Sequence, residues 1–403
     1  MRPVVGRRIL LGVTGGIASY KAVSLARLLA QAGAEVDVVL SRAAREFVGA
    51  ITFEAVTGRP VLGGLLDEGQ ALAHIRLAKA ADLVVIAPAT ADLLARAAHG
   101  RADDLLTAVL LATRAPVLVC PAMNDGMWAH PQVRANAERL QSFGYAVLEP
   151  AIGPLAFGEG VGPGRLPEPE AIVAHCARLL QGTTPLSGRH VVVTAGPTRE
   201  PVDPVRFLSN HSSGRMGAAI AAAAWRRGAR VTLVHGPLAV PLPIGPAAIA
   251  VETTREMHDA VAAALADADV LVMAAAPADF APATVAASKL KKGGEAPLLP
   301  LAHTPDILVG TRAARPAGLV AVGFALETEA LEANAAEKLA RKGLDLIVAN
   351  DATDPDAGFG IDTNRVVILD AHGGRDALPV LTKDEVAEHL LDRISGVIGG
   401  RQG

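Results

Sequence analysis

Short apolar runs alternate with stretches of helical periodicity along the first half of the chain. Residues 8–13, 36–40, 83–87 and 117–120 are apolar runs of strand length, and residues 17–32 repeat leucines at helical spacing. Runs of this length, bounded by glycine or proline and separated by helices, are typical of a parallel sheet buried on both faces. The pattern therefore predicts an α/β domain.

The same alternation restarts after residue 188. Strand-length runs occupy 191–195, 231–235, 270–274, 319–324 and 344–349, with helical stretches at 214–227 and 327–342. Residues 182–188, which contain two glycines and a proline, are typical of an interdomain linker. We predict the α/β class, with two Rossmann-like three-layer domains built on mainly parallel sheets, over residues 1–182 and 189–403.

Residues 152–169 interrupt this regularity. They hold five glycines and four prolines, a composition that predicts an irregular loop rather than a helix or strand. Long loops in compact domains are often lids over binding sites. We expect either a plain surface loop or such a lid, followed by a helix over residues 170–180.

Composition narrows the classes of function. The 403 residues carry 38 basic and 41 acidic side chains, a net charge of −3, and 51% of them are apolar. This composition argues against disorder and gives no basic surface for duplex nucleic acid. Aromatic residues make up 3%, too few for a single-stranded nucleic acid platform. Two cysteines cannot build a disulfide framework or a thiolate zinc site.

The start of the chain superficially resembles a secretory signal. Arg7 and Arg8 precede an apolar run, but Gly15 and Gly16 interrupt it and an amphipathic stretch follows. No apolar run reaches the roughly 18 residues that a membrane span needs. We therefore expect a buried first strand, no membrane association and a cytoplasmic location.

Candidate ligand-binding residues gather where predicted strands end. Gly15 and Gly16 lie between the first strand and the first helix, where backbone N–H groups can face an anion. Ser41 and Thr90 also follow strands, and ligands of open α/β sheets bind beyond the carboxyl ends of the strands. The turn lacks the spaced GxGxxG of dinucleotide sites, which disfavours an NAD dehydrogenase.

Several motifs of this half, taken together, resemble the flavin-dependent cysteine decarboxylase family. They are GGIASYK at 15–21, HIRL at 74–77, APATA at 87–91, ADD at 102–104 and PAMNDGMW at 121–128. The resemblance is to the decarboxylase half of the bifunctional phosphopantothenoylcysteine decarboxylase/phosphopantothenate–cysteine ligases of coenzyme A synthesis. It implies an FMN site that includes Gly15, Gly16, Ser41, Thr90 and Met123.

The resemblance also implies roles for the remaining residues of this half. Flavin oxidation of the cysteine thiol makes loss of CO₂ possible, because the product is a delocalised ene-thiolate that the reduced flavin then reduces. His74 would be the catalytic base or orienter, a role that suits an imidazole near neutral pH. Asn124 would hold the substrate carboxylate through its amide, and Arg165 would contact substrate from the lid.

Phe157 departs from the family pattern. Relatives carry a cysteine at this lid position, and that cysteine protonates the ene-thiolate, which a phenyl ring cannot do. Water or another donor would have to supply this proton, or the last step is impaired. Cys120 is a poor substitute, because a strand cysteine is usually a small core residue. Asp92, where the family often has asparagine, adds a charge near the flavin region.

The second half carries a different set of motifs. TAGPTRE at 194–200 follows a strand, and DPVRFLSNHSSGRMG at 203–217 leads into a helix. Serine and glycine just before a helix suit capping and anion binding, and Arg206 and Arg215 are suited to phosphate or carboxylate. AAAPADF at 274–280, SKLKK at 288–292, PDIL at 305–308 and GFA at 323–325 follow.

These stretches, from about residue 191 to 369, resemble the ligase half of the same bifunctional family. The family activates the phosphopantothenate carboxylate with CTP as an acyl-cytidylate, and the amine of cysteine displaces CMP. Asn210 would bind the acyl-cytidylate, with Arg206 nearby, and lysines would neutralise developing charge. Mg²⁺ should accompany the nucleotide, with ligands that the sequence does not identify. The resemblance places CTP on Ala275, Asp279, Lys289, Pro305, Asp306, Ile307, Leu308, Phe324, Lys338 and Lys342.

The leading hypothesis is thus a bifunctional enzyme that makes 4'-phosphopantetheine from 4'-phosphopantothenate, L-cysteine and CTP. One alternative keeps the ligase but has an impaired or altered decarboxylase, because of Phe157. Another is a flavin-binding regulatory protein, which would not need Lys289 or Asn210. The resemblance further implies a homo-oligomer, a dodecamer of decarboxylase trimers and ligase dimers.

Overall fold

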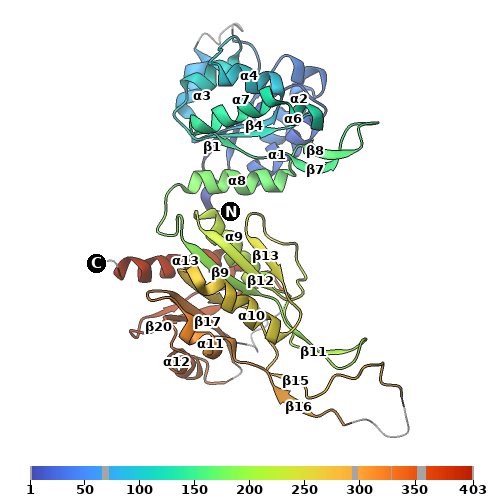
Figure 1. Ribbon diagram of the computed structural model, residues 1–403. Helices are drawn as coiled ribbons and strands as arrows, with labels where there is room; N and C mark the ends of the chain where they lie inside the picture. Colours follow the sequence, from blue (N-terminus) through green and yellow to red (C-terminus); the bar gives the residue numbers. More distant parts are fainter. Residues whose placement is uncertain (1, 66–71, 293–297, 328, 352–359, 402–403) are drawn as a thin grey trace. The chain divides into compact units, whose positions relative to one another are not determined.

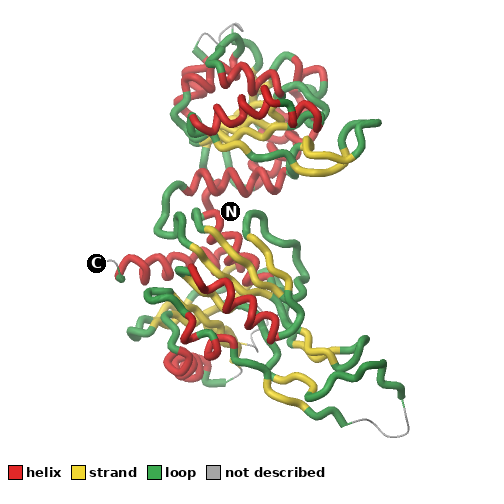
Figure 2. Tube along the Cα trace, in the orientation of Figure 1, coloured by secondary structure: helices red, strands yellow, loops and turns green. Residues whose placement is uncertain are grey.

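The chain folds as two compact units, Met1–Gly182 and Thr183–Gly403 (Figure 1). The computed structural model describes residues 2–65, 72–292, 298–327, 329–351 and 360–401. Each unit holds its own sheet, with helices packed on it, as the colouring by secondary structure makes clear (Figure 2). Among the described residues, none of the helices combines the length and apolarity needed to traverse a lipid bilayer.

A six-stranded parallel sheet forms the centre of the first unit. Its strand order is β3-β2-β1-β4-β5-β6, so the order reverses between β1 and β4. The strands are β1 (Arg8–Val13), β2 (Glu35–Leu40), β3 (Val61–Leu62), β4 (Leu83–Ala89), β5 (Val117–Pro121) and β6 (Ala146–Val147). Ligands of such sheets bind at the reversal, beyond the carboxyl ends of the strands.

Helices cover both faces of this sheet, because successive strand residues point to opposite sides. Ile9 and Leu11 belong to the core under α1 and α8, whereas Leu10 belongs to the core under α3 and α5. The helices are α1 (Ser19–Gln31), α2 (Ala50–Thr57), α3 (Ala73–Ala80), α4 (Ala91–Ala98), α5 (Leu105–Ala112), α6 (Asp125–Ala129), α7 (Pro131–Ser142) and α8 (Pro169–Gln181). Short 3₁₀ turns η1 (Arg2–Val4) and η2 (Ala43–Glu46) complete the unit.

The glycine- and proline-rich stretch 152–169 was predicted to be an irregular loop, and this was wrong for residues 152–154 and 161–165, which are strands. It forms an antiparallel ribbon of β7 (Ala151–Pro154) and β8 (Val161–Arg165) that projects from the unit (Figure 1). Prolines are tolerated here because a two-stranded ribbon leaves half of its backbone N–H groups without a ladder partner. The ribbon retains the position expected of a lid.

An eight-stranded sheet forms the centre of the second unit. Its order is β13-β12-β9-β14-β17-β18-β20-β21, and β20 runs antiparallel to both of its neighbours, β18 and β21. The strands are β9 (His190–Ala195), β12 (Arg230–His235), β13 (Ala247–Ala250), β14 (Val270–Met273), β17 (Val320–Glu327), β18 (Leu346–Asp351), β20 (Val366–Asp370) and β21 (Arg375–Ala377). The sheet reverses order between β9 and β14, next to the glycine-rich turn.

Two helical layers enclose this sheet. Val192 joins the core cluster under α10 and α12, whereas α9 packs on the other face of β9 and β12 together with α13. The helices are α9 (Arg215–Arg226), α10 (Thr254–Ala264), α11 (Ile307–Gly310), α12 (Leu331–Lys342) and α13 (Lys383–Gly400), with 3₁₀ turns η3 (Leu265–Asp267) and η4 (Arg312–Ala314). The predicted helix over 327–342 begins later, because Glu327 is the last residue of β17.

Three two-stranded ladders lie outside the main sheet. They are β10 (Arg199–Pro201) with β11 (Phe207–Ser209), β15 (Phe280–Pro282) with β16 (Leu301–His303), and β19 (Thr363–Asn364) with β22 (Leu381–Thr382). Residues 183–188, predicted as a linker, pack on this unit: Leu186 is fully buried, and the Thr184 hydroxyl donates to the Arg227 carbonyl at 2.5 Å.

Candidate functional sites

A cavity of about 570 Å³ opens beyond the carboxyl ends of β1, β4 and β5 in the first unit. Most of its lining side chains are apolar, which suits a flat aromatic ring system. It contains the predicted residues Gly15, Gly16, Thr90, Met123, Asn124 and Arg165. Residues far apart in sequence therefore meet here, as their positions after strands predicted.

The turn at Gly15 and Gly16 leaves room in the cavity because neither residue has a side chain. A Cβ on Gly15 would lie 2.4 Å from the Cβ of Ala43, so the turn can pass here only without a side chain. A Cβ on Gly16 would meet nothing closer than Thr90 Cγ2 at 4.0 Å, so it would project into the cavity. The residues present thus fit a bound flavin whose backbone cradle is formed by Gly15 and Gly16.

Asn124 presents its amide in a fixed orientation. Its Oδ1 accepts hydrogen bonds from the backbone N–H groups of Gly126 at 2.9 Å and Met127 at 3.3 Å, which caps α6. The Nδ2 group therefore remains to donate to a carboxylate of a ligand. The carboxylate role expected for Asn124 is compatible with this geometry.

Ser41 lines a neighbouring cavity of about 590 Å³ that shares Gly15 and Thr90 with the first. Arg96 lies in its wall and pairs with Asp104 at 2.6 Å and with Asp92 at 3.0 Å. The negative charge that Asp92 adds is thus paired with a guanidinium. Burial raises the pKa of Asp104, but hydrogen bonds from Thr107 and Arg96 outweigh this and hold the pKa below its usual value.

His74 is not among the described residues that line either cavity. It lies on α3, and its Nδ1 is buried without a hydrogen-bond partner. Within the described part of this unit, the structure does not bring His74 to the residues that would hold flavin. Its catalytic role stays a prediction.

The lid ribbon is tied to the body of the unit at its base. The buried Lys21 ammonium pairs with Glu168 at 3.0 Å and donates to the Leu166 carbonyl at 3.3 Å, and Arg165 pairs with Glu168 at 2.7 Å. The hydrogen bond from Lys21 is the main reason why the pKa of Glu168 is lowered. The ribbon is therefore anchored where it meets the cavity.

Phe157 lies at the tip of this ribbon and is fully exposed. Glu159, two residues on, lines the flavin-type cavity, and sequence reasoning did not single it out. Cys120 is completely buried, and burial raises its thiol pKa well above the usual value. Cys120 is thus a core residue, and Glu159 is an acid that the lid brings to the cavity.

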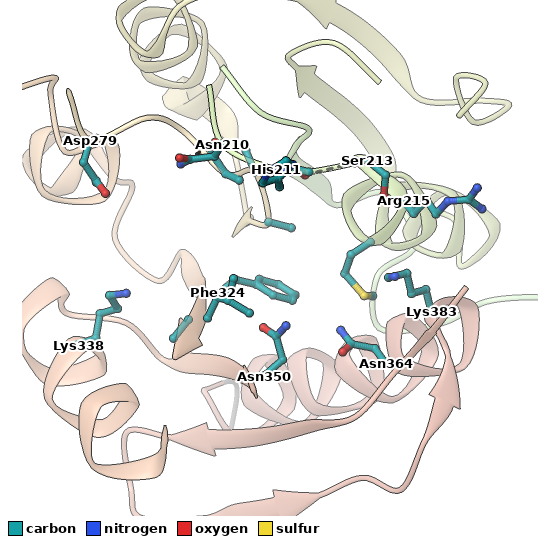
Figure 3. A pocket seen from close by; sticks show the side chains of 18 residues that line it. Asn210, His211, Ser213, Arg215, Asp279, Phe324, Lys338, Asn350, Asn364 and Lys383 are labelled. Atoms are coloured by element: carbon teal, nitrogen blue, oxygen red, sulfur yellow. Dashed lines mark hydrogen bonds between the residues drawn. The ribbon is translucent and has the colours of Figure 1, made fainter. Parts of the chain in front are cut away.

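Two adjoining cavities open beyond the strand ends of the second unit. One, of about 520 Å³, is lined by Asn210, Ala275, Asp279, Phe324 and Lys338 among others (Figure 3). The other, of about 340 Å³, adds the loop before α11 and contains the predicted residues Pro305, Asp306, Ile307, Leu308 and Lys342. Ala275, Asp279, Phe324 and Lys338 line both, so the two form one continuous site.

Short contacts fix the walls of this site. The Asn210 Nδ2 donates to the Pro277 carbonyl at 2.9 Å, and Lys342 pairs with Asp306 at 3.0 Å. Asp306 also caps α11 by accepting from the Val309 N–H at 3.2 Å. Burial raises the pKa of Asp306, but the hydrogen bonds from Lys342 and Val309 outweigh this and lower it.

Arg206 and Lys289 are absent from the described residues that line these cavities. Arg206 instead pairs with the buried Asp203 and donates to the Leu290 carbonyl at 2.8 Å. The hydrogen bond from Arg206 is the main reason why the pKa of Asp203 is strongly lowered. Lys289 is exposed in the loop after β15. Their predicted substrate contacts therefore stay predictions.

Sequence reasoning missed part of this site. Asn364 and Lys383 line the larger cavity together with Arg215, at the end away from Asp279 and Lys338 (Figure 3). Lys383 lies within the Thr382–Glu385 capping pattern at the start of α13, and this pattern indicates a helix start rather than a ligand site. Among the described residues, no group of three or more His, Cys, Asp or Glu side chains is placed to hold a metal ion.

Comparison with known proteins agrees with the division into two units. The flavoprotein family model matches residues 2–181, and the model of the DNA/pantothenate metabolism flavoprotein C-terminal domain matches residues 186–397. A solved structure of the C-terminal domain of a coenzyme A biosynthesis bifunctional protein CoaBC is 36% identical, with 54% of this chain and 100% of that chain covered and a TM-score of 0.47.

Curated relatives match along the full length of the chain. The coenzyme A biosynthesis bifunctional protein CoaBC of Vibrio vulnificus is 44% identical, with 99% of this chain and 100% of that protein covered. The corresponding protein of Mycolicibacterium smegmatis is 46% identical, with 98% and 99% covered. With both units matched in the same order, the chain belongs to the family of bifunctional coenzyme A biosynthesis proteins, CoaBC.

Proposed function

We propose that this chain carries out two consecutive steps of coenzyme A synthesis. The second unit joins L-cysteine to 4'-phosphopantothenate at the expense of CTP, and the first unit decarboxylates the product to 4'-phosphopantetheine with FMN. Membership of the bifunctional family over the whole chain supports both activities. The observation that carries the proposal is that each unit gathers most of its expected site residues around cavities at strand ends.

In the ligase step, the pantothenate carboxylate attacks the α-phosphorus of CTP and pyrophosphate leaves. The amine of cysteine then attacks the acyl carbon of the acyl-cytidylate, and CMP leaves. Lys338 lines both cavities, so its ammonium is placed to neutralise charge that develops between the nucleoside and the acyl group. Asn210, held by the Pro277 carbonyl, would bind the acyl-cytidylate.

Mg²⁺ would reach this site with the nucleotide. The described residues offer no cluster of three carboxylate or imidazole groups, so the phosphates and water would supply most of its oxygen ligands. Asp279 is the acidic residue that lines both cavities and is not engaged in a capping contact there. We propose it as the side chain nearest to the metal–nucleotide complex.

In the decarboxylase step, bound FMN would supply the two-electron oxidation and reduction of the cysteinyl group. The chain would hold it on Gly15, Gly16, Ser41, Thr90 and Met123. The Nδ2 of Asn124 would bind the carboxylate that is lost, and Arg165 would contact substrate from the base of the lid. His74 would hold or move the proton of the thiol.

A second candidate function keeps the ligase and has an altered decarboxylase. Phe157 favours it, because a phenyl ring at the lid tip cannot protonate the ene-thiolate. Glu159 provides an alternative acid within the same lid and cavity. We propose that Glu159 donates this proton, so that decarboxylation still gives the saturated thiol.

We also propose that the chain acts as a homo-oligomer, such as the dodecamer that the resemblance suggests. His74, Arg206 and Lys289 do not reach the cavities of their own units within the described residues. Ile17 and Tyr20, beside the flavin-type cavity, are 68% and 61% exposed. A second copy that covers this surface would bring its His74 to the flavin-type cavity, and a second copy next to the cavities of the second unit would bring Arg206 and Lys289. The cytoplasm, where CTP and reduced thiols are available, is the compartment that we propose.

A product mass spectrum tests the function. The purified chain would receive 4'-phosphopantothenate, L-cysteine, CTP and Mg²⁺ in the absence of oxygen. Saturated 4'-phosphopantetheine establishes both activities. Phosphopantothenoylcysteine as the final product shows a decarboxylase that stops before loss of CO₂. The unsaturated ene-thiol as the final product shows one that stops after that loss, and it overturns proton donation by Glu159. Absence of any acyl-cysteine product overturns the ligase assignment.

A further inference from the structure

The TAGPTRE segment, residues 194–200, runs beside the loop 274–279 that follows β14. Strands β9 and β14 pair in parallel up to Thr194 and Met273, and the two chains stay together beyond that point through an isolated bridge between Pro197 and Ala276. None of residues 194–200 is among the described residues that line the two cavities of the second unit, whereas the loop contributes Asp279 to both. The segment therefore acts on the site through the loop.

Three hydrogen bonds tie the loop to this segment. They run from the N–H groups of Ala275, Ala276 and Ala278 to Thr194 Oγ1, the Gly196 carbonyl and Thr198 Oγ1, at 3.0, 2.9 and 2.9 Å. Residue 277 is a proline and has no N–H to satisfy. Every N–H group of residues 275–278 thus has its acceptor on the segment, and two of the three acceptors are threonine hydroxyls.

Thr198 is also the start of a buried hydrogen-bond chain. The hydroxyl oxygens of Thr198 and Thr254 lie 2.8 Å apart, and both residues are almost completely buried. The Thr254 hydroxyl lies 2.8 Å from Glu200 Oε1, and the Thr254 N–H donates to the same oxygen at 2.8 Å. Glu200 is itself 4% exposed. Because water does not reach these groups, a hydrogen bond lost here leaves a buried polar atom unpaired.

The donors of this chain all point in one direction. The Ala278 N–H can only donate, so Thr198 Oγ1 accepts from it and gives its own proton to Thr254. A carboxylate can only accept, so the Thr254 hydroxyl donates to Glu200, which is nearer than the Ala278 carbonyl at 3.2 Å. Hydrogen bonds in such a chain polarise one another, and the last one is strengthened by the charge of the carboxylate. Glu200 therefore anchors the chain that ends at the Ala278 N–H.

The residues on either side of Ala278 serve the proposed ligase site. The Pro277 carbonyl accepts from Asn210 Nδ2 at 2.9 Å, and Asp279 follows Ala278 directly. Thr304 donates its hydroxyl to the Ala278 carbonyl at 2.6 Å and its N–H to the Asp279 carbonyl at 3.1 Å. Asn210 and Asp279 lie along the same side of the cavity (Figure 3). A displacement of Ala278 would therefore move both side chains.

We propose that Thr198 and Thr254 are positioning residues of the ligase. Anchored by Glu200, their hydroxyls form one chain that holds residues 275–279 where Asn210 and Asp279 act on the substrates. This inference rests on the proposed ligase function and gives the TAGPTRE segment its role. A network that only stabilised the fold would leave the kinetics of the folded protein unchanged, so the kinetics separate the two roles.

Steady-state kinetics of the full chain, followed by pyrophosphate release well below the melting midpoints, test this. Thr198→Val keeps the shape of the side chain but removes the acceptor of the Ala278 N–H, so kcat/KM for CTP should fall about tenfold to hundredfold. Thr198→Ser retains the hydroxyl and should keep most of the activity. Thr232→Val is the matched control: it removes a hydroxyl that lies 2.8 Å from His190 Nε2 in the same unit. It should lower the melting midpoint and leave kcat/KM unchanged.

Two further measurements examine the chain itself. Thr254→Val should also lower kcat/KM, and the double variant with Thr198→Val should lose no more than the larger single loss, because both hydroxyls belong to one chain. Hydrogen–deuterium exchange of the peptide 274–280 should become faster in Thr198→Val, since the Ala278 N–H loses its acceptor. The same peptide should exchange at the wild-type rate in Thr232→Val.

Unchanged kcat/KM in folded Thr198→Val overturns the proposal, as do additive losses in the double variant or an equal loss in Thr198→Ser or Thr232→Val. If the valine variants do not fold, Glu200→Gln carries the test: it keeps an acceptor oxygen but removes the charge, and it should lower kcat/KM about fivefold. An unchanged value overturns the proposal. If the wild type forms no acyl-cysteine product, the proposed function fails and exchange decides alone: faster exchange confined to the peptide 274–280 supports the chain, and unchanged exchange overturns it.

Discussion

Glu388 on α13 accepts two hydrogen bonds from Arg227 on α9, at 3.0 Å from Nε and 2.7 Å from Nη2, with both side chains less than 10% exposed. Arg226 donates to the other carboxylate oxygen at 3.0 Å, and Asp392 pairs with Arg227 at 2.7 Å. This cluster locks the two helices whose first residues, Arg215 and Lys383, line the larger cavity of the second unit. Its charges balance, so each member depends on the others.

Glu388→Ala should lower the free energy of unfolding of the second unit by about 3–5 kcal/mol, because it leaves the buried Arg226 guanidinium without its carboxylate and Arg227 with Asp392 alone. Fluorescence of Trp225 in a Trp128→Phe background would follow urea unfolding of this unit. Glu332→Ala is the matched control: it removes an exposed pair with Arg375 and should cost about 1 kcal/mol or less. Equal effects of the two substitutions would contradict the structural role of the cluster.

Gly15→Ala and Gly16→Ala should both abolish flavin binding, for different reasons. A Cβ on Gly15 collides with Ala43 and displaces the segment after Ser41, so the cradle itself is distorted. A Cβ on Gly16 enters the cavity and meets only Thr90 Cγ2, at an ordinary contact distance of 4.0 Å, so the fold and its thermal stability should be unchanged. Visible flavin absorbance of the purified variants, beside their melting curves, distinguishes the two cases. A flavin-loaded Gly16→Ala protein would contradict the placement of the cofactor.

Stability of the first unit should fall as the pH drops below the ordinary histidine pKa of 6.5. Burial and then the Arg178 charge lower the pKa of His175 on α8. The unfolded chain therefore takes up the proton first, and folding loses at most about 1.4 kcal/mol per pH unit until the folded pKa is reached. Unfolding followed by Trp128 in a Trp225→Phe background measures this. His175→Gln should flatten the pH dependence, whereas His99→Gln, at an exposed helix end, should not.

Glu159→Gln should raise the share of unsaturated ene-thiol in the product, because it removes the carboxyl proton that the lid brings to the cavity. Phe157→Cys in the same background should restore the saturated thiol by supplying a thiol donor at the lid tip. Mass spectrometry of the products gives the ratio, and flavin content controls for cofactor loss. An unchanged ratio in Glu159→Gln would leave water as the donor.

The sheets and the grouping of motifs at strand ends were accessible from sequence. Runs such as 270–274 are apolar at every position, as expected of a sheet covered on both faces, and parallel strands of such a sheet end at one edge. Gly15, Thr90 and Met123 were therefore expected to meet, and they do. The prediction of an α/β fold with parallel sheets is confirmed.

The sequence did not predict the two strands of the lid, β7 and β8, because their pairing does not follow from hydrophobic alternation. Its strands bury little, and what fixes their path is close packing of glycine: a Cβ on Gly164 would lie 2.2 Å from the Met123 carbonyl oxygen. The sequence analysis did not identify Asn364 and Lys383 as site residues for another reason. They are joined by a two-residue ladder between distant segments, and so short a ladder leaves no periodic signal.

Helix α13 is the last element of the second unit to be synthesised. Lys383 and Glu388 lie on α13, which follows all strands of the second unit in the sequence. They are therefore synthesised after every other residue named in the second site. Domains generally fold as units during translation, with N-terminal ones first. The residues that line the cavities of the first unit are all synthesised by residue 166, so these cavities can form while the second unit is still emerging. A ribosome-bound chain that lacks α13 would thus leave Arg226 and Arg227 without their carboxylates, and the larger cavity would lack the wall that Lys383 provides.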